Sequence, residues 1–272
     1  MLSDHKHIEI TDSNSKLSFT TTGGDNWKVW DRYISYDNEQ LYHIGNVCGT
    51  CAFFFRQVKT DLTGSYTVDS VREILNSGIN RLDDCVLQSL AAIIPNGAYE
   101  CILLEIQPYQ TCFNGKGDYF KEDQAPLWYY GGDDDTVGTG MSYYRGTDRV
   151  ISKQEKLFEF FIPLYQPSSL NEERIKYYRE QIRKGRKPTA IALSVIDAKE
   201  SMIFDEEPAD GIICHWGFAN YLLDGHHKIQ AAAREHQPIT LISFISKDAS
   251  FRIVDELVNF YKKSNNENDD TR

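Results

Sequence analysis

The chain has 272 residues, 41% of them hydrophobic and 12% aromatic, which is enough to build one large folded core or two ordinary ones. Its formal net charge of −11 argues against broad binding to the phosphate backbone of nucleic acids, because that binding needs clustered cations. No apolar run is long enough to predict a membrane-spanning helix, and the first residues lack the apolar core of a secretory signal. Six irregularly spaced cysteines favour reduced thiols, so we expect a cytoplasmic protein with no membrane partner.

The first 150 residues predict a β-rich, acidic domain of unrecognised type. Strand-like patterns are found at 16–22, 27–36, 41–47 and 52–58. Apolar residues at helical spacing then predict two helices, at 68–77 and 83–94, and a buried strand follows at 99–106. From 110 to 152 the sequence is rich in Gly, Asp and Tyr, which predicts a long loop and a domain boundary near residue 150.

Two cysteines, Cys48 and Cys51, lie three positions apart in a turn between two predicted strands. Such a pair can supply half of a tetrahedral Zn²⁺ site. The remaining zinc ligands would come from His43, Cys85, Cys101 and Cys112. The pair can also form a redox-active disulfide, or it can consist of structural thiols. The sequence leaves these three interpretations open.

The predicted loop before residue 152 carries two further clusters. Its aromatic residues, Trp128-Tyr129-Tyr130 and Tyr143-Tyr144, could line a pocket or stack a base, or could cover the core. Three consecutive acids, Asp133-Asp134-Asp135, could hold Mg²⁺, although acids on a Gly-rich loop are usually solvated.

The second half alternates strands with helices, and we expect one domain over 151–263. Ser169 and Glu172 form a capping-box pattern that opens a helix through about residue 184, and Gly185 ends it. A second helix is predicted at 226–235 and a last one at 251–262, with the polar tail 264–272 disordered. Apolar runs predict strands at 158–164, at 190–196, up to residue 223 and at 238–245.

A cluster of basic residues occupies 174–187, in the helix that the capping box opens. It is either a small nucleotide or nucleic-acid footprint or the solvated face of a helix. The spacing of Glu180 and Lys184, one helical turn apart, favours the solvated face.

The most informative stretch is the turn Asp224-Gly225-His226-His227-Lys228, where an apolar strand stops and an Ala-rich helix opens at once. A helix start presents unpaired backbone N–H groups and the positive end of the helix dipole, which together form an anion site. His and Lys donate to phosphate oxygens, and Asp can bind Mg²⁺ or accept a proton. The turn therefore predicts a phosphate site, the alternative being a structural turn in which a histidine caps the helix.

Two motifs carry a resemblance: Ile182-Arg183-Lys184-Gly185-Arg186-Lys187-Pro188 after a helix, and Leu223-Asp224-Gly225-His226-His227-Lys228-Ile229 between strand and helix. In that order, over about 158–246, they resemble the ParB/sulfiredoxin superfamily. The expected fold is therefore α+β, with a ParB/sulfiredoxin-like C-terminal domain and a β-rich N-terminal domain. Members of this superfamily include CTP-hydrolysing partition proteins, ATP-dependent sulfiredoxins and free-serine kinases, which use the corresponding turn for nucleotide phosphates.

The resemblance implies that Gly225, His226, His227 and Lys228 surround the phosphate of a nucleotide bound with Mg²⁺. Catalytic roles would fall on Asp224, His226 and His227, with Asp224 as metal partner or base. The chain also departs from the superfamily. Lys228 stands where partition proteins and kinases have Arg, Gln166 lies near the place of the kinases' catalytic Glu, and His226 occupies the turn position of sulfiredoxin's Cys.

Three function classes follow from the sequence. The first is a nucleotide- or phosphate-binding protein, with phosphotransfer or nucleotide hydrolysis at the Asp224–Lys228 turn. The second is a non-catalytic regulatory module in which the ParB-like domain is a scaffold and the N-terminal half binds a protein partner. The third is a ParB-type nuclease, which the acidic net charge disfavours.

Overall fold

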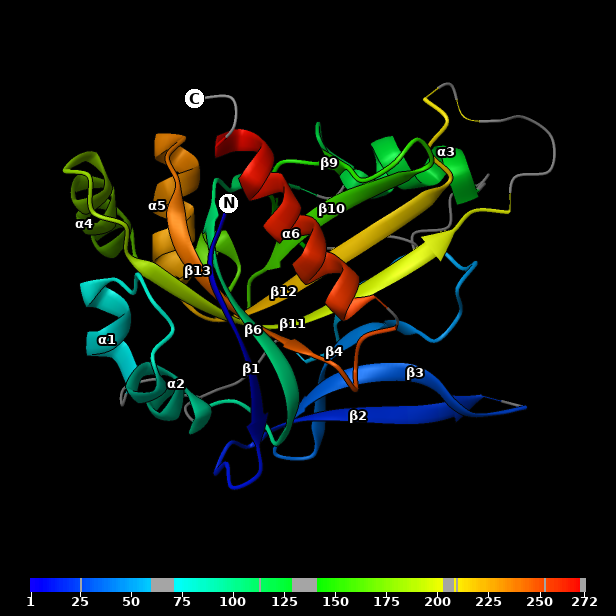
Figure 1. The fold of residues 1–272 in the computed structure, drawn as a ribbon, viewed down its shortest axis with the longest axis horizontal. Helices are drawn as coiled ribbons and strands as arrows, with labels where there is room; N and C mark the ends of the chain where they lie inside the picture. Colours follow the sequence, from blue (N-terminus) through cyan, green and yellow to red (C-terminus); the bar gives the residue numbers. More distant parts are fainter. Residues whose placement is uncertain are drawn as a thin grey trace.

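Two β-sheets and the helices that cover them make up the protein, and the structure, a computed structural model, is mixed α+β (Figure 1). It describes residues 1–24, 26–59, 71–112, 114–128, 141–202, 208, 210–251 and 253–269.

The larger sheet has nine strands within the described part of the chain, in the order β1, β6, β13, β11, β12, β10, β8, β7, with β9 paired to β10. The strand pairs β10–β12 and β11–β13 are parallel, and the other pairs are antiparallel. The strands are β1 Leu2–Ile10, β6 Gly97–Ile106, β7 Tyr109–Thr111, β8 Tyr143–Arg145, β9 Arg149–Val150, β10 Glu155–Ile162, β11 Thr189–Glu200, β12 Cys214–Asp224 and β13 Ile239–Ser246.

The smaller sheet is antiparallel and takes its strands in chain order. They are β2 Leu17–Gly24, β3 Trp27–Tyr36, β4 Glu39–Asn46 and β5 Arg56–Gln57. The strands predicted at 16–22, 27–36 and 41–47 are therefore present, whereas only two residues of 52–58 are in a strand.

The helices are short except for α4, α5 and α6. Their bounds are α1 Arg72–Ser77, α2 Asp84–Ala91, α3 Ala125–Trp128, α4 Glu172–Arg183, α5 His226–Glu235 and α6 Val254–Asp269. A π-helical turn, η2 (Phe120–Gln124), leads into α3, and a 3₁₀ turn, η4 (Pro167–Ser169), precedes α4. Within the described residues, no helix combines the length and apolar character needed to span a membrane.

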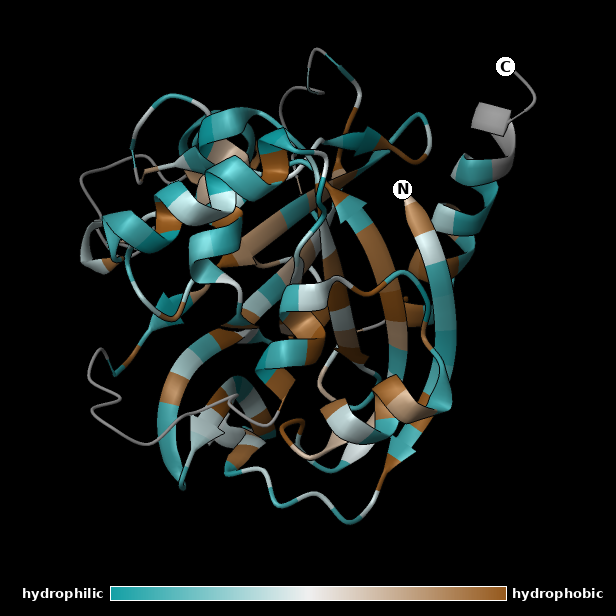
Figure 2. Ribbon diagram, turned by 90° about the vertical axis from the view of Figure 1, so that its left-hand side faces the viewer, coloured by the Kyte–Doolittle hydropathy of each residue, from teal (hydrophilic) through white to brown (hydrophobic). Residues whose placement is uncertain are grey.

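The large sheet is covered on both faces. Successive side chains of a strand point to opposite sides, so each central strand contributes to two cores. In β11, Leu193 faces a core shared with the small sheet, α1 and α2. Its neighbour Ala192 faces a second core shared with α4, α5 and α6. Figure 2 shows the result: the strands inside carry much of the hydrophobic colour, and the helices over them carry both hydrophilic and hydrophobic residues. The protein thus has three layers, with the large sheet in the middle.

The domain boundary expected near residue 150 does not divide the large sheet. Strands β1 and β6 from the first 150 residues extend the sheet on the β13 side, and β7, β8 and β9 pair beyond β10. Segments 1–150 and 151–263 therefore share one sheet and both of its cores. Sequence reasoning missed this because β1 is mostly polar, with only its end residues Leu2 and Ile10 buried, so no apolar pattern indicated a strand there.

Three local expectations were wrong. The stretch 110–152 is not a continuous loop, because it contains η2, α3 and short strands β8 and β9. The cap of α4 is Asn171, whose side chain accepts a hydrogen bond from the Arg174 N–H, while Ser169 lies in η4. The supposed tail from 264 continues α6 to Asp269, and the Asn265 side chain donates to the Leu2 carbonyl near the N-terminus.

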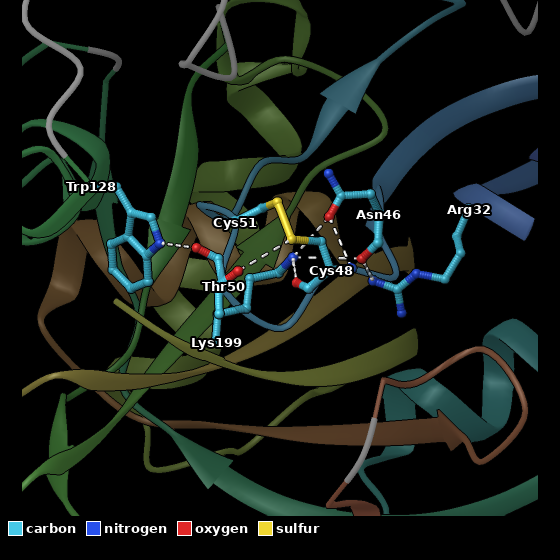
Figure 3. The surroundings of a disulfide bond; sticks show 7 residues. All are labelled: Arg32, Asn46, Cys48, Thr50, Cys51, Trp128 and Lys199. Atoms are coloured by element: carbon cyan, nitrogen blue, oxygen red, sulfur yellow. Dashed lines mark hydrogen bonds between the residues drawn. A yellow bond between two sulfur atoms is a disulfide. The ribbon is translucent and has the colours of Figure 1, made fainter. Parts of the chain in front are cut away.

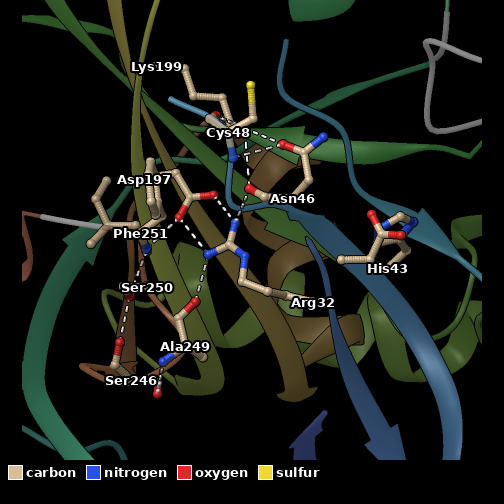
Figure 4. Close-up of polar contacts among 12 residues, drawn as sticks. Arg32, His43, Asn46, Cys48, Asp197, Lys199, Ser246, Ala249, Ser250 and Phe251 are labelled. Atoms are coloured by element: carbon tan, nitrogen blue, oxygen red, sulfur yellow. Dashed lines mark hydrogen bonds and ion pairs between the residues drawn. The ribbon is translucent and has the colours of Figure 1, made fainter. Parts of the chain in front are cut away.

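One buried ion pair joins the two sheets (Figure 4). Arg32 on β3 forms a two-pronged contact with Asp197 on β11, and both side chains are at most 6% exposed. The guanidinium also donates to the carbonyls of Asn46 and Ala249, and the carboxylate accepts from the Phe251 N–H. The carboxylate and the two terminal nitrogens of the guanidinium are therefore hydrogen-bonded, whereas the buried Arg32 Nε has no hydrogen-bond partner among the described residues.

Removing one member of this pair should cost more than removing both. Arg32→Met or Asp197→Leu alone should lower the free energy of unfolding by about 3–5 kcal/mol, because each leaves an uncompensated buried charge. The double variant should lose less than either single variant, because it leaves no unpaired buried charge. Urea denaturation followed by circular dichroism measures all three, and single losses below about 1 kcal/mol would contradict the structural role.

Candidate functional site

The predicted Asp-Gly-His-His-Lys turn lies at the mouth of a pocket of about 170 Å³. Besides the turn, the pocket is lined by Arg72 of α1, Tyr165 of the β10–α4 connection, and Arg174 and Tyr178 of α4. Helices α1, α4 and α5 gather at the same end of the large sheet in Figure 1. The pocket therefore combines residues from both halves of the chain.

Gly225 is required by the way β12 passes into α5. Its φ is +102°, a conformation that side chains rarely adopt. A Cβ at this position would also lie 2.5 Å from the Ala190 Cβ and 2.8 Å from its Cα, which are part of β11. The glycine lets the turn pack directly on the sheet, so that α5 begins at the pocket.

Asp224 and Lys228 form an ion pair across the first turn of α5. The Lys228 Nζ donates to the Asp224 Oδ2 at 3.1 Å and to the Thr189 carbonyl at 2.8 Å. Burial favours the neutral form of Asp224, but the charge and hydrogen bond of Lys228 outweigh it, so the pKa of Asp224 lies below its ordinary value. A carboxylate held in its ionised form in this way is a weak base, which argues against proton abstraction by Asp224.

Both histidines are held as neutral rings by backbone N–H groups. The His226 Nε2 accepts from the Leu164 N–H at 2.9 Å, and the His227 Nε2 accepts from the Asn171 N–H at 3.2 Å. A backbone N–H can only donate, so each Nε2 carries a lone pair and each Nδ1 carries the proton. Burial lowers the pKa of His226 to about 4, and burial together with Arg174 lowers that of His227. Each ring has only its Nδ1–H left to offer a ligand.

Cations outnumber carboxylates in the pocket. Arg72, Arg174 and Lys228 come from three different helices, and Asp224 is the one carboxylate among the described residues of the lining. Burial lowers the pKa of Lys228, and the positive charges of Arg174 and Arg72 lower it further, although Asp224 opposes them. The two arginines therefore act on the same space as the lysine, and the pocket favours an anion.

The sequence located the turn and gave no signal for Arg72. Arg174 belongs to the basic cluster that was expected to be either a nucleotide footprint or a solvated helix face; it lines the pocket, whereas Arg179 and Arg183 pair with Glu235 of α5. Arg72 carries no local sequence signal for a site. Only the packing of α1 beside α4 brings Arg72 to the pocket.

The pocket offers a Mg²⁺ ion one carboxylate among its described lining residues, that of Asp224. Mg²⁺ is usually bound through one or two carboxylates together with substrate phosphates. The Oδ2 of Asp224 is already engaged by Lys228. No group of three or more His, Cys, Asp or Glu side chains suited to a metal is found in the described part of the chain. We derive no step through a metal ion.

The zinc interpretation of Cys48 and Cys51 is wrong for this structure, because the two sulfurs form a disulfide. Zinc binds thiolates, and a disulfide has none. The expectation that all six cysteines are reduced fails with it. The suggested partner ligands do not gather at the turn either: His43 contacts Asp31, Cys101 is buried in the core, and Cys85 and Cys112 are exposed.

The structure describes part of the aromatic cluster predicted in the loop before residue 152, but not the three acids. Tyr143 and Tyr144 are fully buried in β8, which agrees with their covering the core. The Trp128 indole N–H donates to the Thr50 carbonyl in the cysteine turn. Residues 129–140, which include the three consecutive acids, lie outside the described residues.

No family model, curated protein or solved structure matches this chain. The site therefore has to be interpreted from its own geometry.

Replacing Gly225 tests whether the turn is fixed by its contact with β11. Gly225→Ala should lower the free energy of unfolding by about 2–4 kcal/mol, since it combines an unfavourable φ with a clash against the sheet. Gly185→Ala is the matched control: its φ is +78°, but nothing lies within 4 Å of the added Cβ. The control should lose only about 1 kcal/mol. Equal losses in urea denaturation would show that the Ala190 contact has no effect.

The buried His226 should make stability depend on pH. Its folded pKa of about 4 lies below the unfolded value of roughly 6.5, so the unfolded chain binds the extra proton between those values. The contribution is complete above pH 6.5 and is lost as the pH falls towards 4, by about 3 kcal/mol in all. His226→Gln keeps an acceptor for Leu164 but cannot titrate, so its urea stability should fall less between pH 7 and pH 4.5. Parallel profiles of the two proteins would contradict this.

Proposed function

We propose that this protein binds a phosphate-bearing small molecule, with its phosphate at the start of α5. The observation that carries the proposal is the convergence of Arg72, Arg174 and Lys228 on the pocket at this helix N-terminus. Arginines recognise phosphate through two parallel N–H donors, and the helix start adds backbone N–H groups and a favourable dipole.

The size of the pocket limits what enters it. About 170 Å³ is below the 300–1,000 Å³ typical of sites that enclose a whole drug-sized ligand. We therefore place the phosphate inside the pocket and the rest of the molecule, such as the sugar and base of a nucleotide, outside it. Tyr165 at the rim is 42% exposed and offers an aromatic surface to that part.

We also propose that β10–α4–β11 and β12–α5–β13 form a ParB/sulfiredoxin-like unit. In its support, the element order agrees with the expected one, and Gly225 occupies the turn between strand and helix. The superfamily uses this turn for nucleotide phosphates, which is consistent with the cationic pocket.

The contacts favour binding over phosphotransfer. Asp224 is paired with Lys228, and the Nε2 atoms of both histidines accept from backbone N–H groups. Gln166, near the place where the kinases have a catalytic Glu, accepts from the Ser142 N–H through its side chain. None of these groups is arranged as a general base at neutral pH.

A second candidate is a non-catalytic module whose turn is purely structural. The observation in its favour is the same set of contacts, because His226 and His227 tie the turn to the connection between β10 and α4. In that case the arginines would bind no ligand, and the surfaces of the first half would contact a protein partner.

Phosphate binding can be tested on the complete chain with inorganic phosphate, pyrophosphate, ATP and CTP, each with and without Mg²⁺. A compound present at 100 times its Kd should stabilise the fold by about 2.7 kcal/mol in a thermal-shift assay. Arg174→Gln should weaken that binding about tenfold, the usual order for one charge-assisted contact. Arg183→Gln, which removes a charge of the same helix outside the pocket lining, should have no effect.

Asp224→Asn separates binding from catalysis. If the site binds phosphate as proposed, removing its carboxylate should tighten binding, because one repulsive charge is lost. If Asp224 holds a metal or acts as a base, the same change should abolish nucleotide turnover. Stabilisation by none of the probes would favour the non-catalytic module.

A further inference from the structure

The Cys48–Cys51 disulfide lies in the turn that follows β4 (Figure 3). Both cysteines are partly exposed, as exchange with a thiol from solution requires. The disulfide closes a very short loop, with a sequence separation of only three. Closing so short a loop removes little entropy from the unfolded chain, so stabilisation is a weak explanation for this bond.

Hydrogen bonds outside the disulfide hold the turn in place. The Gly49 carbonyl accepts from the Glu200 N–H at 2.8 Å, and the Thr50 carbonyl accepts from the Trp128 indole at 2.9 Å. The Cys48 carbonyl accepts from the Lys199 Nζ at 2.9 Å. All three contacts are independent of the sulfur–sulfur bond. They would keep the two sulfurs close together in the reduced protein as well.

Lys199 brings a buried positive charge to this turn. The residue is 1% exposed, and its Nζ donates to uncharged oxygens: the Cys48 carbonyl and the side chain and carbonyl of Asn46. Asp197, whose charge acts on Lys199, is itself paired with Arg32 (Figure 4). Burial lowers the pKa of Lys199 to about 8; the charge of Asp197 opposes this shift, and that of Arg32 adds to it.

We propose that Cys48 and Cys51 are a reversible thiol–disulfide exchange site that accepts electrons from a dithiol, with Lys199 stabilising the Cys48 thiolate. In the reduced state the thiolate would supply the negative charge that the lysine lacks in the oxidised state. The Thr50 hydroxyl, whose Oγ1 lies 3.7 Å from the Cys48 Sγ, would add a hydrogen bond. Such electropositive, partly exposed surroundings are typical of reactive cysteines.

The reaction takes place in two steps. A thiolate of the dithiol attacks the Cys51 Sγ, the disulfide breaks, and its electron pair goes to the Cys48 Sγ, which is the better leaving group beside Lys199. The second thiolate of the dithiol then attacks the mixed disulfide and releases the Cys51 thiolate. The dithiol becomes a disulfide and two electrons have passed to the protein. One proton of the dithiol reaches the Cys51 sulfur through solvent, and the other is released to solvent because Cys48 remains a thiolate.

The first experiment is a redox titration of the full-length protein with mixtures of reduced and oxidised dithiothreitol. Free thiols are trapped by alkylation and quantified for each cysteine by mass spectrometry, and circular dichroism follows the fold. We expect Cys48 and Cys51 to be reduced together, reversibly and with native circular dichroism. A pair that opens only when the protein unfolds, or that does not re-form, would overturn the proposal.

The second experiment measures the role of Lys199 through the rate of iodoacetamide alkylation of the reduced protein against pH. Cys48 should react as a thiolate at lower pH than the exposed Cys85 and Cys112. Lys199→Met should slow the alkylation of Cys48 at pH 7 about tenfold, because it removes the buried positive charge that is hydrogen-bonded to the Cys48 carbonyl. Lys199→Arg should retain most of the rate, and Lys262→Met, an exposed control on α6, all of it.

The pH dependence of Cys48 alkylation in the wild-type protein tests the proposal even if Lys199→Met does not fold. A Cys48 that titrates at or above the pH of Cys85 and Cys112 would exclude a stabilised thiolate and overturn the proposal. An unchanged Cys48 rate in a folded Lys199→Met variant would do the same.

Discussion

Strands β11, β12 and β13 have no face in contact with solvent, and this two-sided burial organises the rest of the protein. Because side chains alternate along each strand, one set packs on the small sheet, α1 and α2, and the other set packs on α4, α5 and α6. A sheet of this kind must be covered on both sides, and the two halves of the chain share that task. The Arg32–Asp197 pair then fixes the small sheet against β11 at one position, since a buried charge has to meet its partner.

The same strand, β11, carries a polar centre at each end. At its start, the Thr189 carbonyl accepts from Lys228 and Ala190 packs against Gly225, which positions the pocket of α5. Near its end, Lys199 and the Glu200 N–H hold the cysteine turn. Ten residues of extended chain separate the two centres by about 33 Å, so neither can act directly on the ligands of the other. We therefore treat the phosphate pocket and the thiol–disulfide site as independent.

In both centres, buried polar groups are hydrogen-bonded to backbone groups. The histidines of the turn are fixed by backbone N–H groups, and Lys199 is fixed by carbonyl oxygens of the cysteine turn. The two centres differ in their balance of charge. In the pocket, cations outnumber carboxylates among the described lining residues, which favours an anionic ligand. At the cysteine turn, the ammonium of Lys199 donates to uncharged oxygens, and the proposed Cys48 thiolate would bring the opposite charge.

The sequence by itself determined the mixed α+β class, the strand–turn–helix at Gly225 and most elements of the second half, because their periodicity and turn residues are local signals. It also placed the residues of the Asp224–Lys228 turn close together, because neighbours in sequence at a helix start are neighbours in space. Only the tertiary structure decided that β1 and β6 join the same sheet, that Arg72 and Arg174 reach the pocket, and that Lys199 lies against Cys48. These outcomes depend on which strands pair and which helices pack together. Contacts between residues far apart in the chain leave no periodic pattern in the sequence.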